Sequence, residues 1–340
     1  MRPVLRAFVR VGSSFGVCAL AAALAAQDPT PPPPPQAPTP SATAPTTAAP
    51  IAAADFLFRW PLPCTVVVEK AGDKRGKKAT LRYRLEVAAD GAEAVRVRHR
   101  DFTFLTVNGV DATTPAMQRQ LATAQVLAHA VPDLLVSPQG DYLRIDGIDG
   151  VLENVATLAG ESRGASRAQI EQTIAAMRTP PAQEMMQQAG SGDWLAWVGA
   201  WLEFAVPAGE QRESEEELDV FGEPVVAKVT RRHHGPDPAH PGHVRLSITS
   251  TFRGEAGTAA LAAIMARMAS AAGGKPMPPD ELVGVEMTTA IEVVTDPRTL
   301  QPRAAKRRKD FAITTKSAGR VPQRETAEFT FTFAPPPAGK

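Results

Sequence analysis

The stretch from Val131 to Leu158 constrains the fold more than any other part of the chain, because it predicts a tight hairpin that leads directly into a helix. Pro138–Asp141 has the composition of a turn, and Leu143 and Ile145 alternate with polar residues as in a half-buried strand. After Asp146 the apolar residues recur at three- and four-residue spacings, which is typical of an amphipathic helix. The chain therefore runs from a strand at the edge of a sheet directly into a helix, and this helix must pack on that sheet.

Residues 1–26 have the pattern of a secretory signal peptide, with three arginines, an apolar run from Phe15 to Ala26 and small residues at its end. We expect cleavage after Ala25 or Ala26, and therefore an exported protein, periplasmic or extracellular. A retained membrane helix is the alternative, but a stable anchor takes about 20 apolar residues. Cys18 lacks the preceding sequence of a lipoprotein signal, so we expect no lipid anchor and no stable membrane span in the mature chain.

Residues 27–54 consist mainly of Pro, Thr and Ala, and they predict a disordered, semi-rigid tether of the polyproline type. The remaining residues 55–335 are within the range of a single domain. The formal net charge of the chain is +1, and loss of the three signal arginines would leave −2. A net charge this close to zero argues against a nucleic-acid partner. No pattern in the sequence predicts the oligomeric state.

Cys64 is the only cysteine that remains after signal cleavage, so no internal disulfide is expected. It shares strand parity with Val66 and Val68, which predicts a small buried side chain. The alternative is a reactive or intermolecular thiol.

The segment from Leu81 to Val107 predicts a hairpin with one apolar face and one face of arginines. A three-residue loop ending at Gly91 would place Leu85 opposite Val95. The opposite face would then carry a ladder formed by Arg82, Arg84, Arg96 and Arg98. Facing like charges are destabilising, so the ladder needs either acidic neighbours, for which the later run Glu213–Asp219 is available, or an anionic partner. Past Arg100 the alternation changes parity, which predicts a β-bulge near Asp101.

Two helical regions follow the hairpins. Thr114-Pro115 predicts the start of the first. The second, from Ser166 to Phe204, is expected to break at Thr179-Pro181 and at Gly190-Gly192. Its last piece places four rings along one side of a helix: Trp194, Trp197, Trp201 and Phe204. These rings predict core packing against the sheet, the lining of an apolar cavity, or an interfacial membrane helix.

The loop from His233 to His243 holds four of the six histidines, His233, His234, His240 and His243. Such a set is able to hold zinc, copper or nickel. Prolines and the absence of a second set of ligands disfavour this reading, so we expect no metal and no cofactor.

Residues 255–274 predict a helical insertion, with Leu261 and Met265 on its apolar side, that resembles a mobile lid. The strands that follow alternate cleanly, and roughly eight to ten strands are expected in total. So many strands favour strong curling. The predicted class is α+β, with a large curled antiparallel sheet, or half-barrel, and helices packed on its concave face.

This arrangement is similar to the lipoprotein-carrier (LolA-like) and LppX-type half-barrels. The residues that carry the resemblance are the hairpin-helix stretch VSPQGDYLRIDGIDGVLENV, the tryptophan-containing helix and the last strand pairs around Thr295–Leu300. More closely still, the chain resembles secreted bacterial proteins that share the hairpin-helix stretch. The resemblance implies the fold and an apolar ligand, but it transfers no functional residue. The helical insertion and the missing lipoprotein signal depart from the carrier pattern.

No catalytic motif is apparent, including the nucleophile elbow, the P-loop and the dinucleotide fingerprint. We therefore expect a non-enzymatic protein that binds an apolar or amphiphilic ligand, lipid-like in character, between sheet and helices. The alternative is a cell-envelope interaction or structural protein that engages an anionic partner through its arginines. A third hypothesis is a metal-dependent activity at the histidine loop.

Overall fold

The structure, a computed structural model, describes residues 56–122, 124–125, 131–161, 171, 174–175, 177–220, 223–271, 278 and 281–334. Its strands are β1 (Cys64–Lys74), β2 (Lys77–Ala89), β3 (Val95–Val107), β4 (Val110–Asp111), β5 (Asp133–Val136), β6 (Tyr142–Asp146), β7 (Gln211–Val220), β8 (Glu223–Pro236), β9 (Val244–Arg253), β10 (Leu282–Thr295), β11 (Pro302–Thr315) and β12 (Gly319–Phe333). Its helices are α3 (Pro115–Gln120), α5 (Ile148–Glu161), α7 (Pro180–Trp197), the 3-10 helix η1 (Gly199–Trp201) and α8 (Glu255–Ala271).

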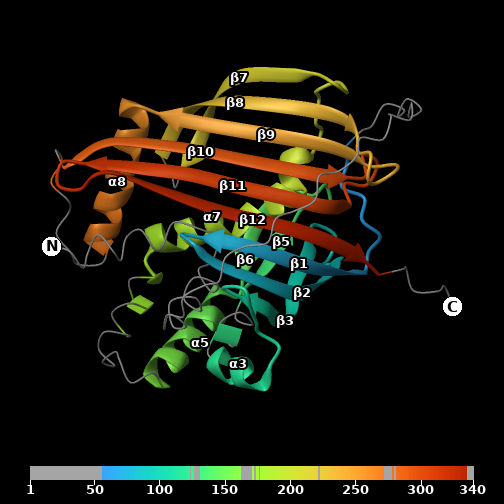
Figure 1. The fold of residues 1–340 in the computed structure, drawn as a ribbon, viewed down its shortest axis with the longest axis horizontal. Coiled ribbons are helices and arrows are strands. Elements are labelled where there is room, and N and C mark those ends of the chain that lie inside the picture. Colours follow the sequence, from blue (N-terminus) through green and yellow to red (C-terminus); the bar gives the residue numbers. More distant parts are fainter. Residues whose placement is uncertain are drawn as a thin grey trace.

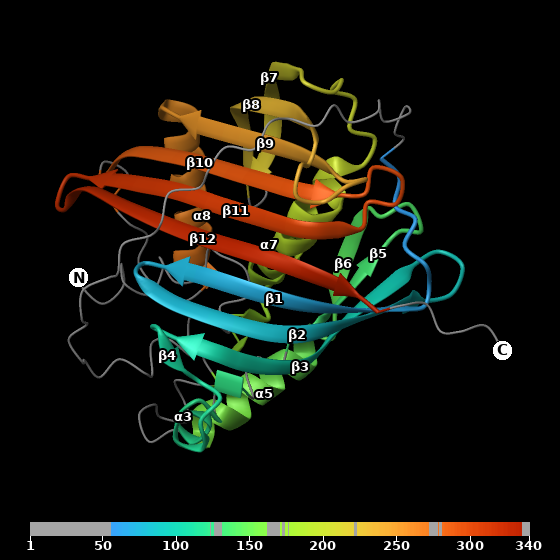
Figure 2. The same cartoon turned by 45° about the vertical axis from the view of Figure 1, so that its right-hand side comes forward.

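The twelve strands form one open sheet in the order β6-β5-β3-β2-β1-β12-β11-β10-β9-β8-β7, with β4 paired to β3. The sheet curls, and α7 and α8 pack against its concave face, behind the strands in Figures 1 and 2. We call this face the inner face. The predicted α+β class with a curled antiparallel sheet is confirmed. Twelve strands exceed the expected eight to ten, and β4, with two residues, is too short to show the apolar-polar alternation that marks a half-buried strand.

The hairpin predicted within Val131–Leu158 is confirmed as β5 and β6, and α5 follows it after Gly147. Its turn is closed by a bond from Ser137 N to Asp141 O of 2.7 Å. The predicted apolar face of the return strand is wrong at Leu143, whose side chain is 47% exposed. The register between β5 and β6 shifts at this point; Ile145 is the buried residue of β6, and Tyr142 is partly buried.

The hairpin of β2 and β3 has a longer loop than predicted. Ala89 pairs with Val95, and Leu85 pairs with His99 rather than with Val95. The predicted and observed registers differ by four residues, so both keep the same side chains on the inner face. Hydrophobic alternation cannot distinguish them, which is why the prediction failed.

The bulge predicted near Asp101 is confirmed. The register of β2 and β3 shifts there, and Asp101 has a positive φ of 56°. The extra residue returns Phe104 to the inner face, where it is buried.

Helix α7 starts after Thr179, as predicted, but it runs through Gly190 without the expected break. Gly190 lies against β6, where an added Cβ would be 2.4 Å from Ile145 Cγ2. One turn earlier, the Gln187 side chain accepts from Ile145 N at 2.6 Å and donates to Ile145 O at 3.2 Å. The glycine therefore permits close helix-sheet packing, and Gln187 satisfies the backbone of the edge strand.

The inner face carries two hydrophobic clusters. The first, which we call the first core, gathers α7, η1 and the segment Phe56–Trp60 on the strands from β6 to β9 in the order of the sheet. The second core lies between α8 and strands β8 to β11. The predicted helical insertion is thus confirmed as a helix, and it packs directly on the sheet. Cys64 packs against the first core, and burial raises the pKa of its thiol to about 11, so it is protonated at neutral pH.

The predicted signal peptide and tether, residues 1–54, lie outside the described residues. Among the helices that the structure describes, none is both long enough and apolar enough to cross a membrane.

The close approach at Gly190 predicts a specific sensitivity. Gly190→Ala should lower the free energy of unfolding by about 1–3 kcal/mol, because the new methyl group overlaps Ile145. Gly150→Ala is the matched control, since Gly150 lies in α5 with nothing within 4 Å of the added Cβ. It should be neutral or slightly stabilising. Urea unfolding of both variants measures the difference, and equal midpoints would contradict the tight α7–β6 contact.

Candidate ligand-binding site

The three predicted tryptophans form the centre of the first core. Trp194 and Trp197 lie on α7 and Trp201 on η1, and none has any exposed area. The Trp197 ring meets Phe329 and Phe331 of β12 edge to face, both at 5.4 Å between centroids. The indoles are therefore packed against protein side chains.

Of the other predicted apolar residues, Phe204 joins the tryptophans as a buried member of the first core, with its ring centroid 5.8 Å from that of Trp201. Leu261 instead packs against the second core. Met265 is half-buried on α8. The predicted set is divided between two clusters, and ligand binding by these residues stays a prediction.

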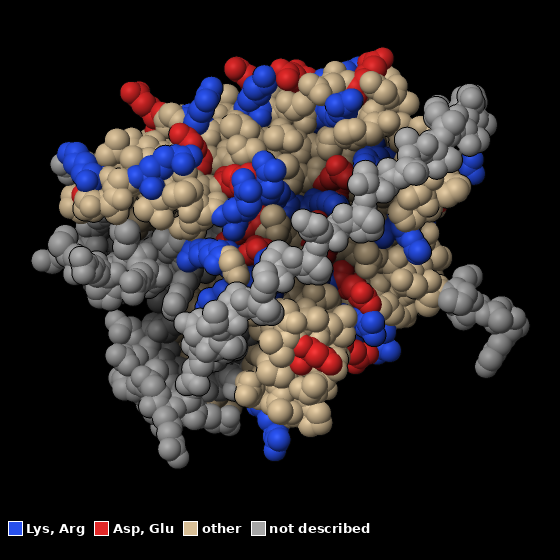
Figure 3. Space-filling model, viewed as in Figure 1, with Lys and Arg blue, Asp and Glu red and all other residues tan. Residues whose placement is uncertain are grey.

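The arginine ladder lies on the outer face of the sheet, where basic and acidic side chains are interspersed (Figure 3). The observed register separates Arg84 from Arg96, which faces Ala88 instead. The ion pairs of the ladder and of Arg100 are Arg82–Glu69 (2.7 Å), Arg84–Asp101 (2.9 Å), Arg84–Glu86 (3.1 Å), Arg96–Asp146 (2.7 Å), Arg96–Asp90 (2.7 Å), Arg96–Asp133 (3.1 Å), Arg98–Asp133 (3.4 Å) and Arg100–Glu86 (3.9 Å). Five arginines thus meet six carboxylates.

The acidic run Glu213–Asp219 is not the partner of the ladder, contrary to one sequence-based alternative. It lies on β7 at the far edge of the sheet, where Glu213 pairs with Lys228 and Glu216 pairs with Arg231. Nearby carboxylates from the hairpin loop, the bulge and β6 neutralise the arginines instead. Anion binding by the ladder stays a prediction.

The histidine loop does not bring its four imidazoles together. His233 is buried in β8 beside Phe56, and its Nδ1 accepts from Gly235 N at 2.9 Å. His234 projects to the other side of the strand and contacts Ser247. His240 contacts the Asp237 carboxylate at 2.9 Å. Within the described residues, no three His, Cys, Asp or Glu side chains are grouped as a metal site.

A group of charged side chains that the sequence analysis missed lies on the inner face. Four cations from two strands surround two carboxylates, and we call this set the inner basic cluster: Lys70, Lys74, Arg307 and Lys309 with Asp193 and Glu325. Strand register fixes the arrangement, because Lys74 of β1, Glu325 of β12 and Lys309 of β11 lie in one cross-strand row. Cross-strand neighbours on one face are about 5 Å apart.

Asp193 connects this cluster to α7. Its carboxylate accepts from Lys70 Nζ at 2.8 Å and lies 3.0 Å from the guanidinium of Arg307. Burial alone would raise the pKa of this carboxyl, but Lys70 and Arg307 outweigh it and hold the pKa at about 2. Lys70 also lies over the Phe329 ring at 5.0 Å. The helix is thereby pinned to β1 and β11 at the level of its tryptophans.

Glu325 holds the other half of the cluster. Lys74 Nζ lies 3.5 Å from Glu325, and both side chains are about one-quarter exposed, at 26% and 23%. Burial lowers the pKa of the Lys309 ammonium; Glu325 partly offsets this effect, and Arg307 and Lys74 add to it.

Apolar side chains adjoin the basic row on the same face. Two residues beyond Lys309 on β11, Phe311 lies beside Met287 of β10. The Nζ atom of Lys309 is 5.9 Å from the centroid of the Phe311 ring. Ile313 follows Phe311, and Leu261 of α8 packs against the same cluster. These four side chains, which we call the apolar rows, are only partly buried. The inner face therefore changes from charged to apolar between neighbouring rows.

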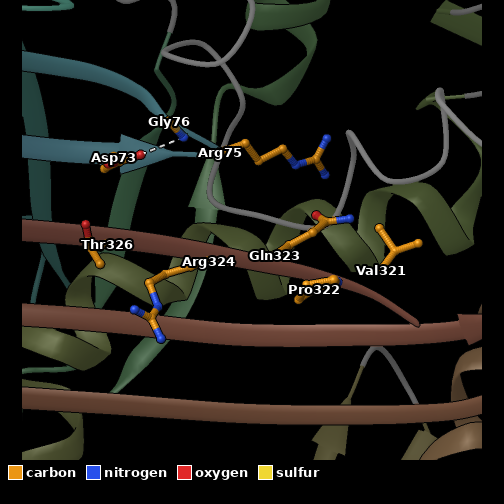
Figure 4. Close-up of a pocket in the computed structure, with 8 residues that line it drawn as sticks. All are labelled: Asp73, Arg75, Gly76, Val321, Pro322, Gln323, Arg324 and Thr326. Carbon is orange, nitrogen blue, oxygen red and sulfur yellow. Dashed lines mark hydrogen bonds between the residues drawn. The ribbon is translucent and has the colours of Figure 1, made fainter. Parts of the chain in front are cut away.

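A pocket of about 440 Å³ lies between the β1–β2 turn and the start of β12 (Figure 4). Gly76 N donates to Asp73 there, at 2.9 Å. Val321 and Gln323 project to one side of β12 and Arg324 to the other. Gln323 shares the inward-facing parity of Glu325, whereas Asp73, Arg324 and Thr326 share the parity of Asp310 and Glu328, so most of the pocket belongs to the outer face of the sheet.

The site was missed because its charges interrupt otherwise apolar strands. Lys70 and Lys74 belong to β1, which runs from Cys64 to Lys74, and their charges hide their place on the inner face. Arg307 and Lys309 alternate in step with Phe311, so the three side chains point to the same face of β11. A cation at a strand position that faces the core was the signal from which the site could have been predicted.

The anchoring role of Asp193 predicts a large effect of its charge. Asp193→Asn should lower the free energy of unfolding by about 2–4 kcal/mol, because two half-buried cations lose their shared partner. Glu328→Gln is the matched control on the outer face, where both members of the Lys306–Glu328 pair are well exposed, and it should cost less than about 1 kcal/mol. Urea unfolding at pH 7 compares them, and equal effects would refute the anchor.

His99 predicts a pH dependence of stability. Burial beneath Tyr83 and Phe102 lowers the pKa of its imidazole from the ordinary 6.5 to about 4. The unfolded chain therefore binds a proton between pH 6.5 and 4 that the folded chain does not. Stability should be highest above pH 6.5 and fall by roughly 3 kcal/mol as the pH drops to 4.

His99→Phe keeps the ring stacking and removes the proton, so unfolding measured from pH 7 to 4 should show a flatter profile. His243→Phe, outside both cores, should keep the slope of the unaltered protein. A slope unchanged in His99→Phe would contradict the assignment.

The sequence matches no protein-family model and no curated protein. Among solved structures, one described as lipid-protein interactions in lipovitellin is similar over 82% of this chain and 26% of that chain, with a TM-score of 0.37 and 7% identity. This chain thus spans about a quarter of that protein. The complex of Pseudomonas aeruginosa MucA and MucB matches over 81% of this chain and 94% of that chain, with a TM-score of 0.13 and 10% identity. Both TM-scores are below 0.5, so the resemblance to LolA-like and LppX-type half-barrels stays a prediction.

Proposed function

We propose that this chain is an exported, non-enzymatic binding protein whose ligand lies on the inner face of the sheet beside α8. The observation that supports the proposal is the set of partly buried apolar side chains in the apolar rows, which retain exposed surface beside α8. An apolar ligand would complete their burial, and removing apolar surface from water contributes about 25 cal/mol per Å².

The site differs from the one expected from sequence. The tryptophans already fill the first core and supply the rigid side of the structure, whereas the apolar rows retain exposed surface. Binding an anionic partner through the outer arginines has less support, because the four ladder arginines and Arg100 already pair with six carboxylates.

The apolar rows predict binding of a neutral fluorescent probe. N-phenyl-1-naphthylamine should bind the full chain with a rise in emission, and Met287→Gln should weaken its affinity roughly tenfold, which corresponds to about 1.4 kcal/mol. Val226→Gln is the matched control, since Val226 is 59% exposed on the outer face of β8. Circular dichroism checks that both variants are folded.

Failure of the probe to bind the unaltered chain would contradict the proposal. Equal affinities of both variants would show that the ligand lies elsewhere on the molecule. Mass spectrometry of an organic extract of the chain, purified without detergent, should detect a long-chain compound near one per protein.

A further inference from the structure

We propose that two hydroxyl groups on the inner face, those of Ser250 on β9 and Thr289 on β10, bind the uncharged head group, a hydroxyl or an ester, of an amphiphile whose hydrocarbon part lies on the apolar rows. This inference rests on the proposed function and adds the chemical class of its ligand. The two residues are cross-strand partners, so one head group is able to contact both.

The hydroxyl pair interrupts two strands whose inward-facing side chains are otherwise apolar. On β9 the inward-facing residues are Val244, Leu246, Ile248, Ser250 and Phe252, and on β10 between Val285 and Val293 they are Val285, Met287, Thr289, Ile291 and Val293. The register places the two exceptions directly opposite each other. They therefore form one polar spot in an apolar surface.

Neither hydroxyl of the pair is used within the part of the chain that the structure describes, where no hydrogen bond joins either side chain to another group. One residue further along the same two strands, on the outer face, the hydroxyl oxygens of Thr251 and Thr288 contact each other at 3.1 Å. Ser250 and Thr289 are partly buried. A hydroxyl group in apolar surroundings is costly without a hydrogen-bond partner, so its partner here is water or a ligand.

The apolar side chains around the pair favour an amphiphile. Two residues from Thr289 along β10, Met287 lies beside Phe311 of β11, and Leu261 of α8 packs against the same cluster. Residues at this spacing are about 7 Å apart along a strand. A head-group oxygen at the pair therefore places the first methylene groups of its chain over Met287 and Phe311, towards α8.

The charges near the pair favour an uncharged head group. Lys309 lies next to Thr289 on β11, and Glu325, its neighbour on β12, offsets its charge. Arg231 of β8 projects to the same face and pairs with Glu216. Both cations have a carboxylate nearby, and the groups at the pair itself are neutral hydroxyls that both donate and accept hydrogen bonds.

Displacement of N-phenyl-1-naphthylamine from the full chain tests the inference. 1-Decanol and methyl decanoate should displace the probe, and decanoate should need a higher concentration than 1-decanol. Thr289→Val keeps the shape of the side chain and removes its hydroxyl. It should raise the concentration of 1-decanol at half displacement roughly fivefold and leave the affinity of the probe unchanged, and Ser250→Ala should act in the same direction.

Thr249→Val is the matched control, because Thr249 lies on β9 beside Ser250 but on the outer face, and it should change neither value. Circular dichroism checks that the variants are folded.

Each contrary outcome has a separate meaning. A 1-decanol value that is unchanged in Thr289→Val and Ser250→Ala, or that changes only as much as the affinity of the probe, would show that the pair binds water only and overturn the head-group assignment. Decanoate that displaces the probe at a lower concentration than 1-decanol would overturn the uncharged class. Failure of the probe to bind the unaltered chain would refute the proposed function itself, and the inference with it.

Discussion

An open sheet of twelve strands leaves one whole apolar face to be covered, and the docking of α7 covers its centre. The Asp193 carboxylate is tied to β1 and β11, which fixes the rotation of the helix about its axis. With that rotation set, Trp194 and Trp197 fall on the sheet and their rings meet the phenylalanines of β12. A polar contact thus specifies how the apolar surfaces meet, and the apolar contacts supply most of the stability.

The two edges of the open sheet are protected by different means. At β6 the side-chain amide of Gln187 takes the place of a neighbouring strand, since it both donates to and accepts from the backbone of Ile145. At β7 the glutamates of the acidic run alternate along the exposed edge, and charge there disfavours pairing with another chain. An open sheet therefore remains compatible with a single folded unit.

Much of the architecture was predictable from sequence, because alternation and turn residues depend on local physics. The structure has four features where the patterns predicted them: the hairpin of β5 and β6, the start of α7, the helix α8 and the bulge at Asp101. The β2–β3 register was not predictable, because a shift of four residues preserves which side chains face inward. The candidate site was missed because its charges come from β1, β11, β12 and α7, and only the folded sheet brings them together.

The pairing of β1 with β12 has a consequence for the order of events during synthesis. These two strands lie at the middle of the sheet, yet Val66 is paired with Phe333, near opposite ends of the folded region. The strands on the β2 side and those on the β11 side can form hairpins early, but they join only after the last strand has left the ribosome. Until then the halves of the inner face lack their common centre, Asp193 lacks the strand pair that it bridges, and the inner basic cluster is incomplete. Completion of the sheet and of the inner basic cluster is therefore one late step.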